Sequence, residues 1–345
     1  MQCLLPFLAI LIIAWGDIKA NQTGGYAVNF VFCTDPHVTN IKPRSRVDNY
    51  YETIMRKLDW VVNFTNENNA HLLLGGDIVD SYTAHPEVVN KIAQSLSLLK
   101  KQAFSIIGNH DIYGHNYEVI NQVILGTLYN SGLLKLLTMT PLVISDGKLN
   151  IQLSGANYVP DIDSRKDLYS INKLPGVNCA IHLIHGFLVN KNWPEFDHSQ
   201  YTTVQEVVTQ ADVVCSGHEH HGYGIETVNN VIYTNPGAAG RIHASVGEMS
   251  RVPKISLINC YADRVDVSLV PIPCALGTEV MSREHIIAEK EKQQRLGTFT
   301  DALQTQMLAC DINAVFEQQA KTLGIETSVR VKAIEAYRVY DEARV

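Results

Sequence analysis

The sequence has no excess of basic residues, no internal repeat and no low-complexity segment. Its 28 lysines and arginines are outnumbered by 35 aspartates and glutamates, which gives a formal net charge of −7 and an isoelectric point near 6.0. A general nucleic-acid-binding protein normally displays a basic face, so this balance argues against that class. With 46% hydrophobic and 18% charged residues, the composition also excludes a disordered or collagen-like chain.

Cysteine and long apolar runs are also scarce. Seven cysteines occur among the 345 residues, and Cys33 and Cys215 lie in apolar stretches where a free thiol packs well. If a disulfide forms, Cys260 and Cys274 are the expected pair, although spacing alone does not decide this. The apolar run at residues 4–14 is too short to cross a bilayer comfortably.

Residues 1–20 have the outline of a secretory signal peptide. Small residues at Gly16 and Ala20 follow the apolar run, so a cut after either one is consistent with the pattern. The amino terminus itself is the only positive charge before the run. The sequons at Asn21 and Asn63 are compatible with export. We therefore expect a secreted or exported protein, with an uncleaved anchor or a buried first strand as the alternatives.

Apolar segments with strand character alternate with segments of helical spacing over the next 250 residues, which is the pattern of an α/β fold. Helices are predicted at 48–66 and 88–99. Strands are predicted at 27–34, 71–74, 103–107, 179–184, 212–215, 224–228, 231–234, 254–259 and 264–270. Residues 26–272 are therefore expected to form one domain. From about residue 277 the chain becomes charged and helical, and we interpret 277–345 as a helical tail that packs on the domain or faces a partner.

A polar cluster follows directly after each of five predicted strands. The clusters are Asp35-Pro36-His37, Gly76-Asp77, Gly108-Asn109-His110-Asp111, His185-Gly186 and Gly217-His218-Glu219-His220. Loops at the carboxyl ends of strands are where α/β folds place their ligands. Carboxylates, imidazoles and an amide oxygen are donors suited to manganese, iron or zinc without any thiolate. The sequence therefore predicts a metal site, and a dinuclear site needs one carboxylate that bridges two cations.

This series of motifs resembles the calcineurin-like metallophosphoesterase superfamily. The match runs from about Phe30 to His220, with the motifs in the expected order. The turn at Asn235-Pro236-Gly237 is also similar to the superfamily's pattern, and the motif spacing is similar to class III cyclic nucleotide phosphodiesterases. The resemblance implies a four-layer αββα sandwich, in which two mixed β-sheets are flanked by helices. It also makes residues 26–272 the catalytic domain.

The resemblance further implies a role for each candidate residue. Asp35, His37 and His220 would hold one metal; Asn109, His185 and His218 would hold a second; Asp77 would bridge the two. The cofactors would be two divalent or mixed-valence ions of manganese, iron or zinc, and a bridging hydroxide would attack the phosphorus of a small-molecule phosphate ester. His110 would protonate the departing oxygen, with Asp111 holding its ring. A phosphodiester is the favoured substrate over a phosphomonoester.

Other candidate residues near the motifs have simpler interpretations. His71, His182 and His221 are assigned structural roles, as is His115, which is the first candidate for a further substrate contact. Tyr113, Tyr117 and Trp193 are candidates to line a pocket, but a core or surface role is the favoured interpretation.

Rival functions within the same superfamily stay open to different degrees. A purple acid phosphatase would carry a tyrosine where this chain has Asp80, and it would lack His37. A nuclease is disfavoured by the signal-like segment and the acidity. A sphingomyelinase-like enzyme usually has a longer gap than that between Asp35 and Asp77. A non-catalytic interaction scaffold would have gaps among the ligands, and this sequence has none. Substrate, oligomeric state and the role of the tail are not determined by the sequence.

Overall fold

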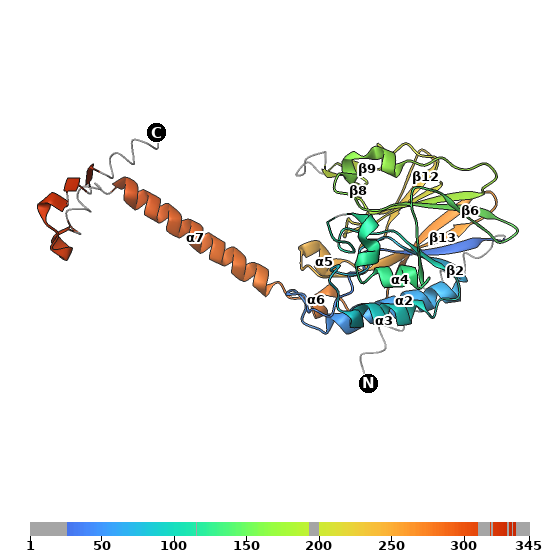
Figure 1. Ribbon diagram of the computed structural model, residues 1–345, viewed down its shortest axis with the longest axis horizontal. Coiled ribbons are helices and arrows are strands. Elements are labelled where there is room, and N and C mark those ends of the chain that lie inside the picture. Colours follow the sequence, from blue (N-terminus) through green and yellow to red (C-terminus); the bar gives the residue numbers. More distant parts are fainter. Residues whose placement is uncertain are drawn as a thin grey trace. The chain divides into compact units, whose positions relative to one another are not determined.

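The computed structural model describes residues 26–114, 116–192, 200–309, 318, 320–329, 331–332 and 334–335 (Figure 1). The signal-like segment, His115 and Trp193 lie outside these residues. The chain divides into two compact units, Met1–Ser282 and Arg283–Val345. Among the described residues, no helix is both long enough and apolar enough to cross a membrane.

The first unit contains two six-stranded mixed sheets. The first sheet has the order β14-β13-β1-β2-β3-β4, in which β1 to β4 are parallel. Strand β13 pairs antiparallel with β1, and β14 pairs antiparallel with β13. Its strands are β1 (Val28–Cys33), β2 (Ala70–Leu74), β3 (Ala103–Ser105), β4 (Leu134–Leu136), β13 (Lys254–Cys260) and β14 (Val265–Pro271). The predicted strands thus exist in this sheet, whereas β4 lies in a segment where no strand is predicted from the sequence.

The second sheet has the order β11-β12-β10-β7-β6-β5. Its four central strands are parallel, while β5 and β11 form antiparallel edges. Its strands are β5 (Leu142–Ser145), β6 (Asn150–Ala156), β7 (Cys179–Ile184), β10 (Val213–Ser216), β11 (Gly224–Val228) and β12 (Val231–Asn235). The bounds of β7 and β11 are those expected from the sequence.

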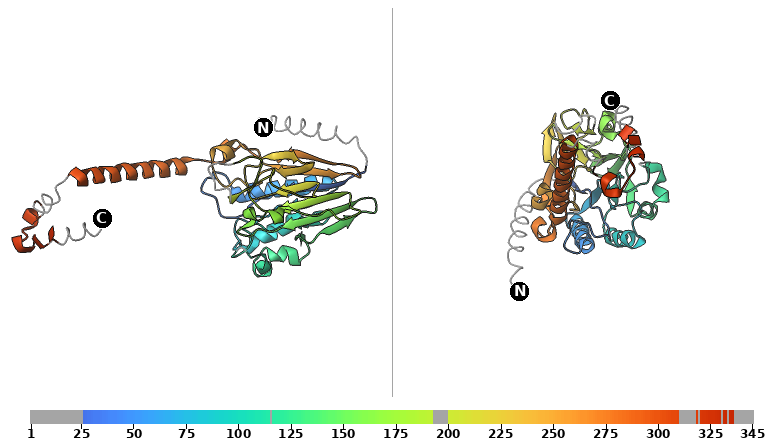
Figure 2. Two further views of the ribbon diagram at one scale, coloured as in Figure 1. Left: turned by 90° about the horizontal axis from the view of Figure 1, so that it is seen from above. Right: turned by 90° about the vertical axis from the view of Figure 1, so that its left-hand side faces the viewer.

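The two sheets pack face to face around an apolar core (Figure 2). Alternate residues of β1 point to opposite faces, as the period of two in a strand requires. Phe30 and Phe32 are buried between the sheets with residues such as Leu153 and Ile181, whereas Val31 and Cys33 face the helices. The predicted two-sheet sandwich is therefore confirmed.

Helices α2 (Tyr50–Glu67), α3 (Pro86–Leu96) and α4 (Gly126–Asn130) cover the outer face of the first sheet (Figure 1). The side chain of Asn49 caps α2 by accepting from the backbone N–H of Glu52, and Pro86 occupies the first turn of α3. Ile54, Leu58 and Val61 lie on one side of α2 and are buried. The helical spacing in the sequence thus identifies the face that packs on the sheet.

The outer face of the second sheet is covered differently. Its cluster of buried side chains includes Ile162, Tyr169 and Leu188. These residues belong to the short 3₁₀ helices η2 (Ile162–Ser164) and η3 (Lys166–Tyr169) and to the small ribbon of β8 (Leu188–Val189) and β9 (Thr202–Thr203). In the described part of the chain the fourth layer is therefore built from short 3₁₀ turns and a ribbon. Three further short helices of this unit are η1 (Tyr117–Gln122), α5 (Val246–Ser250) and α6 (Gly277–Val280).

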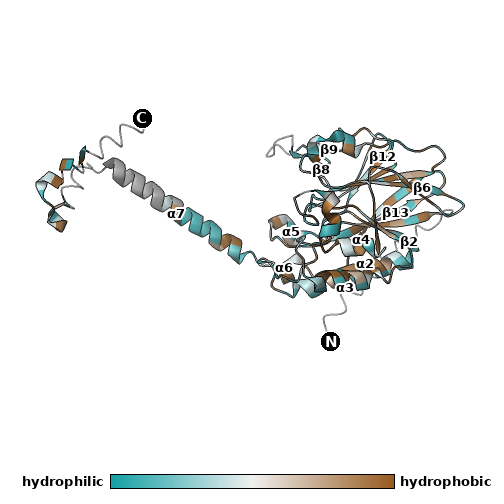
Figure 3. Ribbon diagram, in the orientation of Figure 1, coloured by the Kyte–Doolittle hydropathy of each residue, from teal (hydrophilic) through white to brown (hydrophobic). Residues whose placement is uncertain are grey.

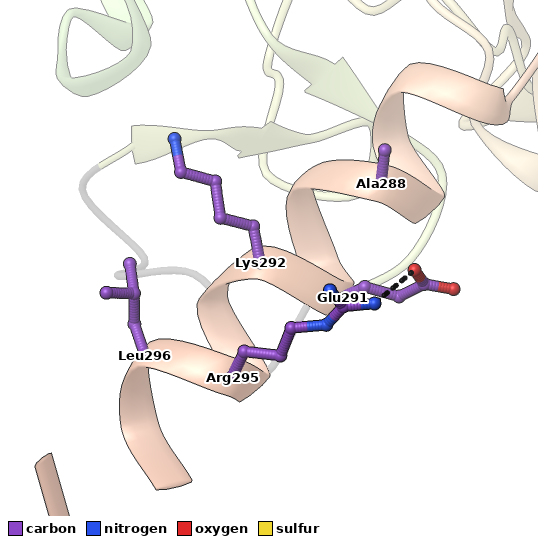
Figure 4. A pocket seen from close by; sticks show the side chains of 5 residues that line it. All are labelled: Ala288, Glu291, Lys292, Arg295 and Leu296. Atoms are coloured by element: carbon purple, nitrogen blue, oxygen red, sulfur yellow. Dashed lines mark ion pairs between the residues drawn. The ribbon is translucent and has the colours of Figure 1, made fainter. Parts of the chain in front are cut away.

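The second unit begins with α7 (Glu284–Ala309). Figure 3 shows mostly hydrophilic residues along its coloured part. Ile287 and Leu296 are about half exposed, so the described part of α7 has no continuous buried stripe of its own. A shallow hollow on α7 is lined by Ala288, Glu291, Lys292, Arg295 and Leu296 (Figure 4). Its polar side chains are Lys292 and an exposed ion pair between Glu291 and Arg295 at 3.8 Å, and such a pair stabilises a helix only weakly.

The five described cysteines are all free. The expectation of a Cys260–Cys274 pair is wrong, because Cys274 instead accepts a hydrogen bond from Arg241 at 3.7 Å. The sulfur of Cys260 lies 3.1 Å from that of Cys179, a residue on the facing sheet. Sequence spacing could not reveal this neighbour, because it depends on how the sheets pack.

Candidate metal centre

All seven predicted ligand residues meet where the carboxyl ends of five strands come together. Asp35 and His37 follow β1, Asp77 follows β2 and Asn109 follows β3, all in the first sheet. The remaining three come from the second sheet and lie just after β7 and β10: His185, His218 and His220. Because these strands are parallel within each sheet, their carboxyl ends share an edge, and the packed sheets bring the two edges together.

The donor atoms form two groups that share Asp77. Asp35, His37, Asp77 and His220 make one group, and Asp77, His185 and His218 make the other, with the atoms of each group lying within 4.8 Å of one another. The Nε2 atoms of His37 and His220 are 3.1 Å apart. The two carboxylate oxygens of Asp77 have different neighbours. Oδ2 lies 3.5 Å from His37 Nε2 and 3.4 Å from His185 Nε2, whereas Oδ1 accepts from the backbone N–H of His110. Asn109 joins the second group, because its Oδ1 lies 3.1 Å from His185 Nε2.

Four of these residues have a left-handed backbone. The φ angles are 50° at Asp35, 46° at His37, 48° at Asp77 and 72° at His218. Residues other than glycine rarely adopt this conformation, and each such position costs of order 1–3 kcal/mol. Strain of this kind concentrates at functional sites, where the surrounding fold holds it in place. The backbone thus identifies the same loops that the sequence motifs do.

The glycine of each of two motifs lets neighbouring loops approach closely. A Cβ atom added at Gly108 would lie 2.1 Å from Oδ1 of Asp77, and one added at Gly76 would lie 2.5 Å from Nδ1 of His185. Gly76 also has a φ of 90°, which favours glycine. These positions are therefore glycine because any side chain would displace a candidate ligand.

Two histidine rings have a partner at the nitrogen that faces away from the site. His185 Nδ1 lies 2.7 Å from the carbonyl oxygen of Gly75, a hydrogen bond that fixes the ring and its tautomer. His37 Nδ1 lies 3.3 Å from Oδ1 of Asp80, an ion-pair contact without hydrogen-bond geometry. Asp80 also forms a third group of possible donors with His37 and His110, and this neighbourhood was not predicted from the sequence. The place of Asp80 three residues after Asp77 is the signal that the sequence offers.

Burial and neighbouring charge set the protonation of the cluster. Burial lowers the pKa of His218 to about 3 and that of His220 to about 2, so both are neutral at pH 7, as metal ligation requires. Burial also raises the pKa of Asp35, although His185 opposes this. Burial would likewise raise the pKa of Asp77, but His185 and His37 hold it well below its usual range.

The donor set therefore fits divalent cations. Asp35 and Asp77 are fully buried carboxylates. Burial lowers the pKa of His185, but the charge of Asp77 raises it to about 10, so in the absence of a cation this ring supplies the positive charge that Asp77 needs. A buried carboxylate is stable only when it is paired with positive charge or coordinates a metal. Oxygen and nitrogen donors with no thiolate suit manganese, iron or zinc.

His110 lies beside the cluster, and its ring is held by a different residue from the one expected. Its backbone N–H donates to Oδ1 of Asp77 at 2.8 Å, and its Nδ1 lies 2.7 Å from the carbonyl oxygen of Asp80. The expectation that Asp111 holds this ring is wrong.

Asp111 is fully buried and accepts from the backbone N–H groups of Ile78, Val79 and Gly108 at 2.8, 3.2 and 2.9 Å. Burial, followed by the charge of Asp77, raises its pKa to about 7. Asp111 therefore ties the loop after β2 to the loop after β3, which positions Asp77 relative to Asn109.

The remaining candidate residues are three histidines outside the cluster and two tyrosines proposed to line a pocket. His71, His182 and His221 have partners of their own at Gln102, at Ser154 and Leu168, and at Glu219. These three therefore act in structure, as the sequence suggested. Tyr113 is exposed and stacks edge-on against Tyr82, with ring centroids 5.7 Å apart. The position of the Tyr117 side chain is not described.

The part of the chain that carries the site matches the sequence model of a known protein family. A family model described as calcineurin-like phosphoesterase matches residues 28–222, which include every candidate ligand. No curated protein sequence matches the chain.

Solved structures with a similar chain trace include the calcineurin-like phosphoesterase YfkN from Bacillus subtilis and a dimetal phosphatase from Danio rerio. YfkN is 13% identical with a TM-score of 0.46, and the match covers 79% of this chain and 97% of YfkN. The Danio rerio protein is 11% identical with a TM-score of 0.43, and the match covers 71% of this chain and 99% of that protein.

Replacement of Asp80 by alanine tests the orientation of His37. Asp80→Ala removes the carboxylate beside His37 Nδ1 but keeps the backbone carbonyl that holds His110. Because such partners tune ligand basicity and orientation, we expect Mn²⁺ affinity to fall about 10–100-fold by isothermal titration calorimetry. Asp263→Ala, at an exposed carboxylate in the turn between β13 and β14, is the matched control. Equal affinities for the Asp80→Ala and parent proteins would remove Asp80 from the site.

Proposed function

The chain belongs to the calcineurin-like phosphoesterase family, and we propose that it is a metal-dependent hydrolase of phosphate esters that prefers phosphodiesters to phosphomonoesters. The observation that carries this proposal is the pair of donor groups that share Asp77 in one buried cluster. Two cations that share a carboxylate are the arrangement that phosphoester hydrolysis uses in two-metal sites. A non-catalytic scaffold is not supported, because all seven donors are present and converge.

In this proposal Asp35, His37 and His220 would hold one cation, Asn109, His185 and His218 would hold the other, and Asp77 would serve both. The cations would be manganese, iron or zinc, in keeping with the oxygen and nitrogen donors. When bound, such a pair supplies positive charge to the phosphate oxygens and lowers the pKa of an attacking water. The protein's own contribution is to fix the seven donors on rigid strand ends before any substrate arrives.

His110 is the proposed proton donor to the departing oxygen. Its Nδ1 faces the carbonyl oxygen of Asp80, and a carbonyl can only accept, so Nδ1 carries a hydrogen. The other ring nitrogen, Nε2, is then the one that gives up a proton when the ring is charged. Asp77 holds the backbone N–H of His110, which fixes the main chain at this residue, and the carbonyl oxygen of Asp80 orients the ring.

The preference for a phosphodiester is supported by aromatic side chains beside the cluster. The rings of Tyr158 and Phe187 lie 5.5 and 6.0 Å from that of His218. Tyr82 and Tyr113, which are 39% and 62% exposed, follow Asp80 and His110 in the chain. A diester carries a second organic group on its phosphate, and apolar ring faces near the cations favour such a substrate over a monoester.

We also propose export of the protein. Residues 4–14 and the small residues after them support a signal peptide, and both lie outside the described residues. The sequon at Asn63 adds little, because it lies inside α2 with Thr65 buried. Amino-terminal sequencing of protein from its native host should begin near Asp17 or Asn21. Soluble cytosolic protein that still begins at Met1 would overturn this proposal.

His110→Ala separates chemistry from metal binding. We expect this variant to keep both metals and to lose about 10²–10⁴-fold in turnover on an ester with a poor leaving group, because no group then protonates the departing oxygen. The loss should be smaller for a p-nitrophenyl ester, whose leaving group needs no proton. Metal content by mass spectrometry and turnover of two diesters with different leaving-group pKa values measure both effects.

Asp77→Ala is the matched comparison, because it removes the shared carboxylate and should lose at least one metal per chain. A general folding defect in the His110 variant would slow both esters equally. Equal slowing, or metal loss parallel to that of Asp77→Ala, would mean that His110 is not the proton donor.

The preference for diesters is tested on the parent protein. Bis-p-nitrophenyl phosphate should be turned over faster than p-nitrophenyl phosphate, and the reverse order would contradict the diester preference.

A further inference from the structure

Two buried thiols face each other across the sandwich, far from the candidate metal centre. Cys179 is the first residue of β7 in the second sheet, and Cys260 is the last residue of β13 in the first sheet. Both side chains have no exposed surface, and their sulfur atoms are 3.1 Å apart. Both belong to the apolar core between the sheets.

The strand registers place this pair at the opposite end of the core from the ligands. Cys260 pairs with Val28 at the start of β1, the strand that leads to Asp35. Cys179 begins the strand that leads to His185. At about 3.3 Å per residue, six or seven residues of strand put the thiols roughly 20 Å from the candidate ligands. The thiols therefore have no part in the site already described.

We propose that Cys179 and Cys260 form a disulfide that joins the two sheets when the chain folds in the presence of a small-molecule disulfide. The bond length in a disulfide is about 2.05 Å, so the sulfurs must approach by about 1 Å, which small rotations of the two side chains supply. Both residues lie at strand ends. Among the described cysteines, no other pair of sulfur atoms lies within hydrogen-bonding distance.

The chemistry is thiol–disulfide exchange with a reagent such as oxidised glutathione. One protein thiolate attacks a reagent sulfur, which breaks the reagent's S–S bond and releases one glutathione thiolate. The second protein thiolate attacks the resulting mixed disulfide, which forms the Cys179–Cys260 bond and releases the second glutathione. The protein loses two electrons and two protons, and the two released thiolates take up those protons as the reagent is reduced.

Burial determines when this reaction occurs. Neither sulfur is exposed in the folded chain, and burial disfavours the reactive thiolate form. The reagent must therefore reach the thiols before the sheets close over them. Once formed, the bond closes a loop between residues 81 positions apart, which restricts the unfolded chain and stabilises the folded one. It would also fix the relative position of the two sheets, each of which carries part of the ligand set.

Refolding in two redox buffers tests the proposal without any assay of activity. The full chain is unfolded with reductant and then refolded either with reduced glutathione alone or with a mixture of reduced and oxidised glutathione. Alkylation, intact mass and peptide mapping then count the remaining thiols. We expect the oxidised sample to have two fewer alkylated cysteines and a linked Cys179–Cys260 peptide. It should also melt several degrees above the reduced sample.

Three single variants control the result. Cys179→Ser and Cys260→Ser should lose the linked peptide, whereas Cys215→Ser, at another buried cysteine of the second sheet, should keep it. Production of the full chain directly in an oxidising compartment gives the same readout if refolding fails. Folded protein from either route with both thiols free would overturn the proposal, as would a peptide that links Cys260 to Cys274.

Discussion

Asp77 is buried beside two imidazoles that come from different sheets, and much of the molecule is arranged to hold it there. Its Oδ2 lies within 3.5 Å of both His37 and His185, and its Oδ1 accepts the backbone N–H of His110. Because a buried carboxylate must be matched by positive charge, the residues around it cannot be replaced freely. Gly108 must lack a side chain, and Asp111 must hold the neighbouring backbone, for Asp77 to reach both donor groups.

The two-sheet sandwich supplies the rigidity that this arrangement needs. The first sheet carries Asp35, Asp77 and Asn109, and the second carries the histidines that follow β7 and β10. Neither sheet alone contains both donor groups, so the site depends on the apolar core that fixes the sheets against each other. That core also offsets the backbone strain at Asp35, His37, Asp77 and His218, which no local interaction would favour.

The sequence predicts the parts of the site that depend on local pattern. A polar cluster after an apolar strand is visible without a structure, and β1, β2, β3, β7 and β10 lie where the pattern placed them. The sequence does not predict what depends on packing between distant segments. The contact of Asp80 with His37 and the three backbone bonds to Asp111 link the loop after β2 to those after β1 and β3. For the same reason the neighbour of Cys260 is Cys179, which is distant in sequence. Strands β4 and β5 were not predicted because they have only three and four residues. Strand β6 was also not predicted, although Ile151 and Leu153 alternate with polar residues there and offer the signal of a strand.

Anomalous X-ray scattering can show whether two cations share Asp77. Crystals of the protein grown with manganese would be measured on both sides of the manganese absorption edge. We expect two anomalous peaks that both lie within bonding distance of Asp77, one beside His37 and His220 and the other beside Asn109 and His185. A single peak, no peak, or two peaks of which only one contacts Asp77 would mean that the cations do not share this carboxylate.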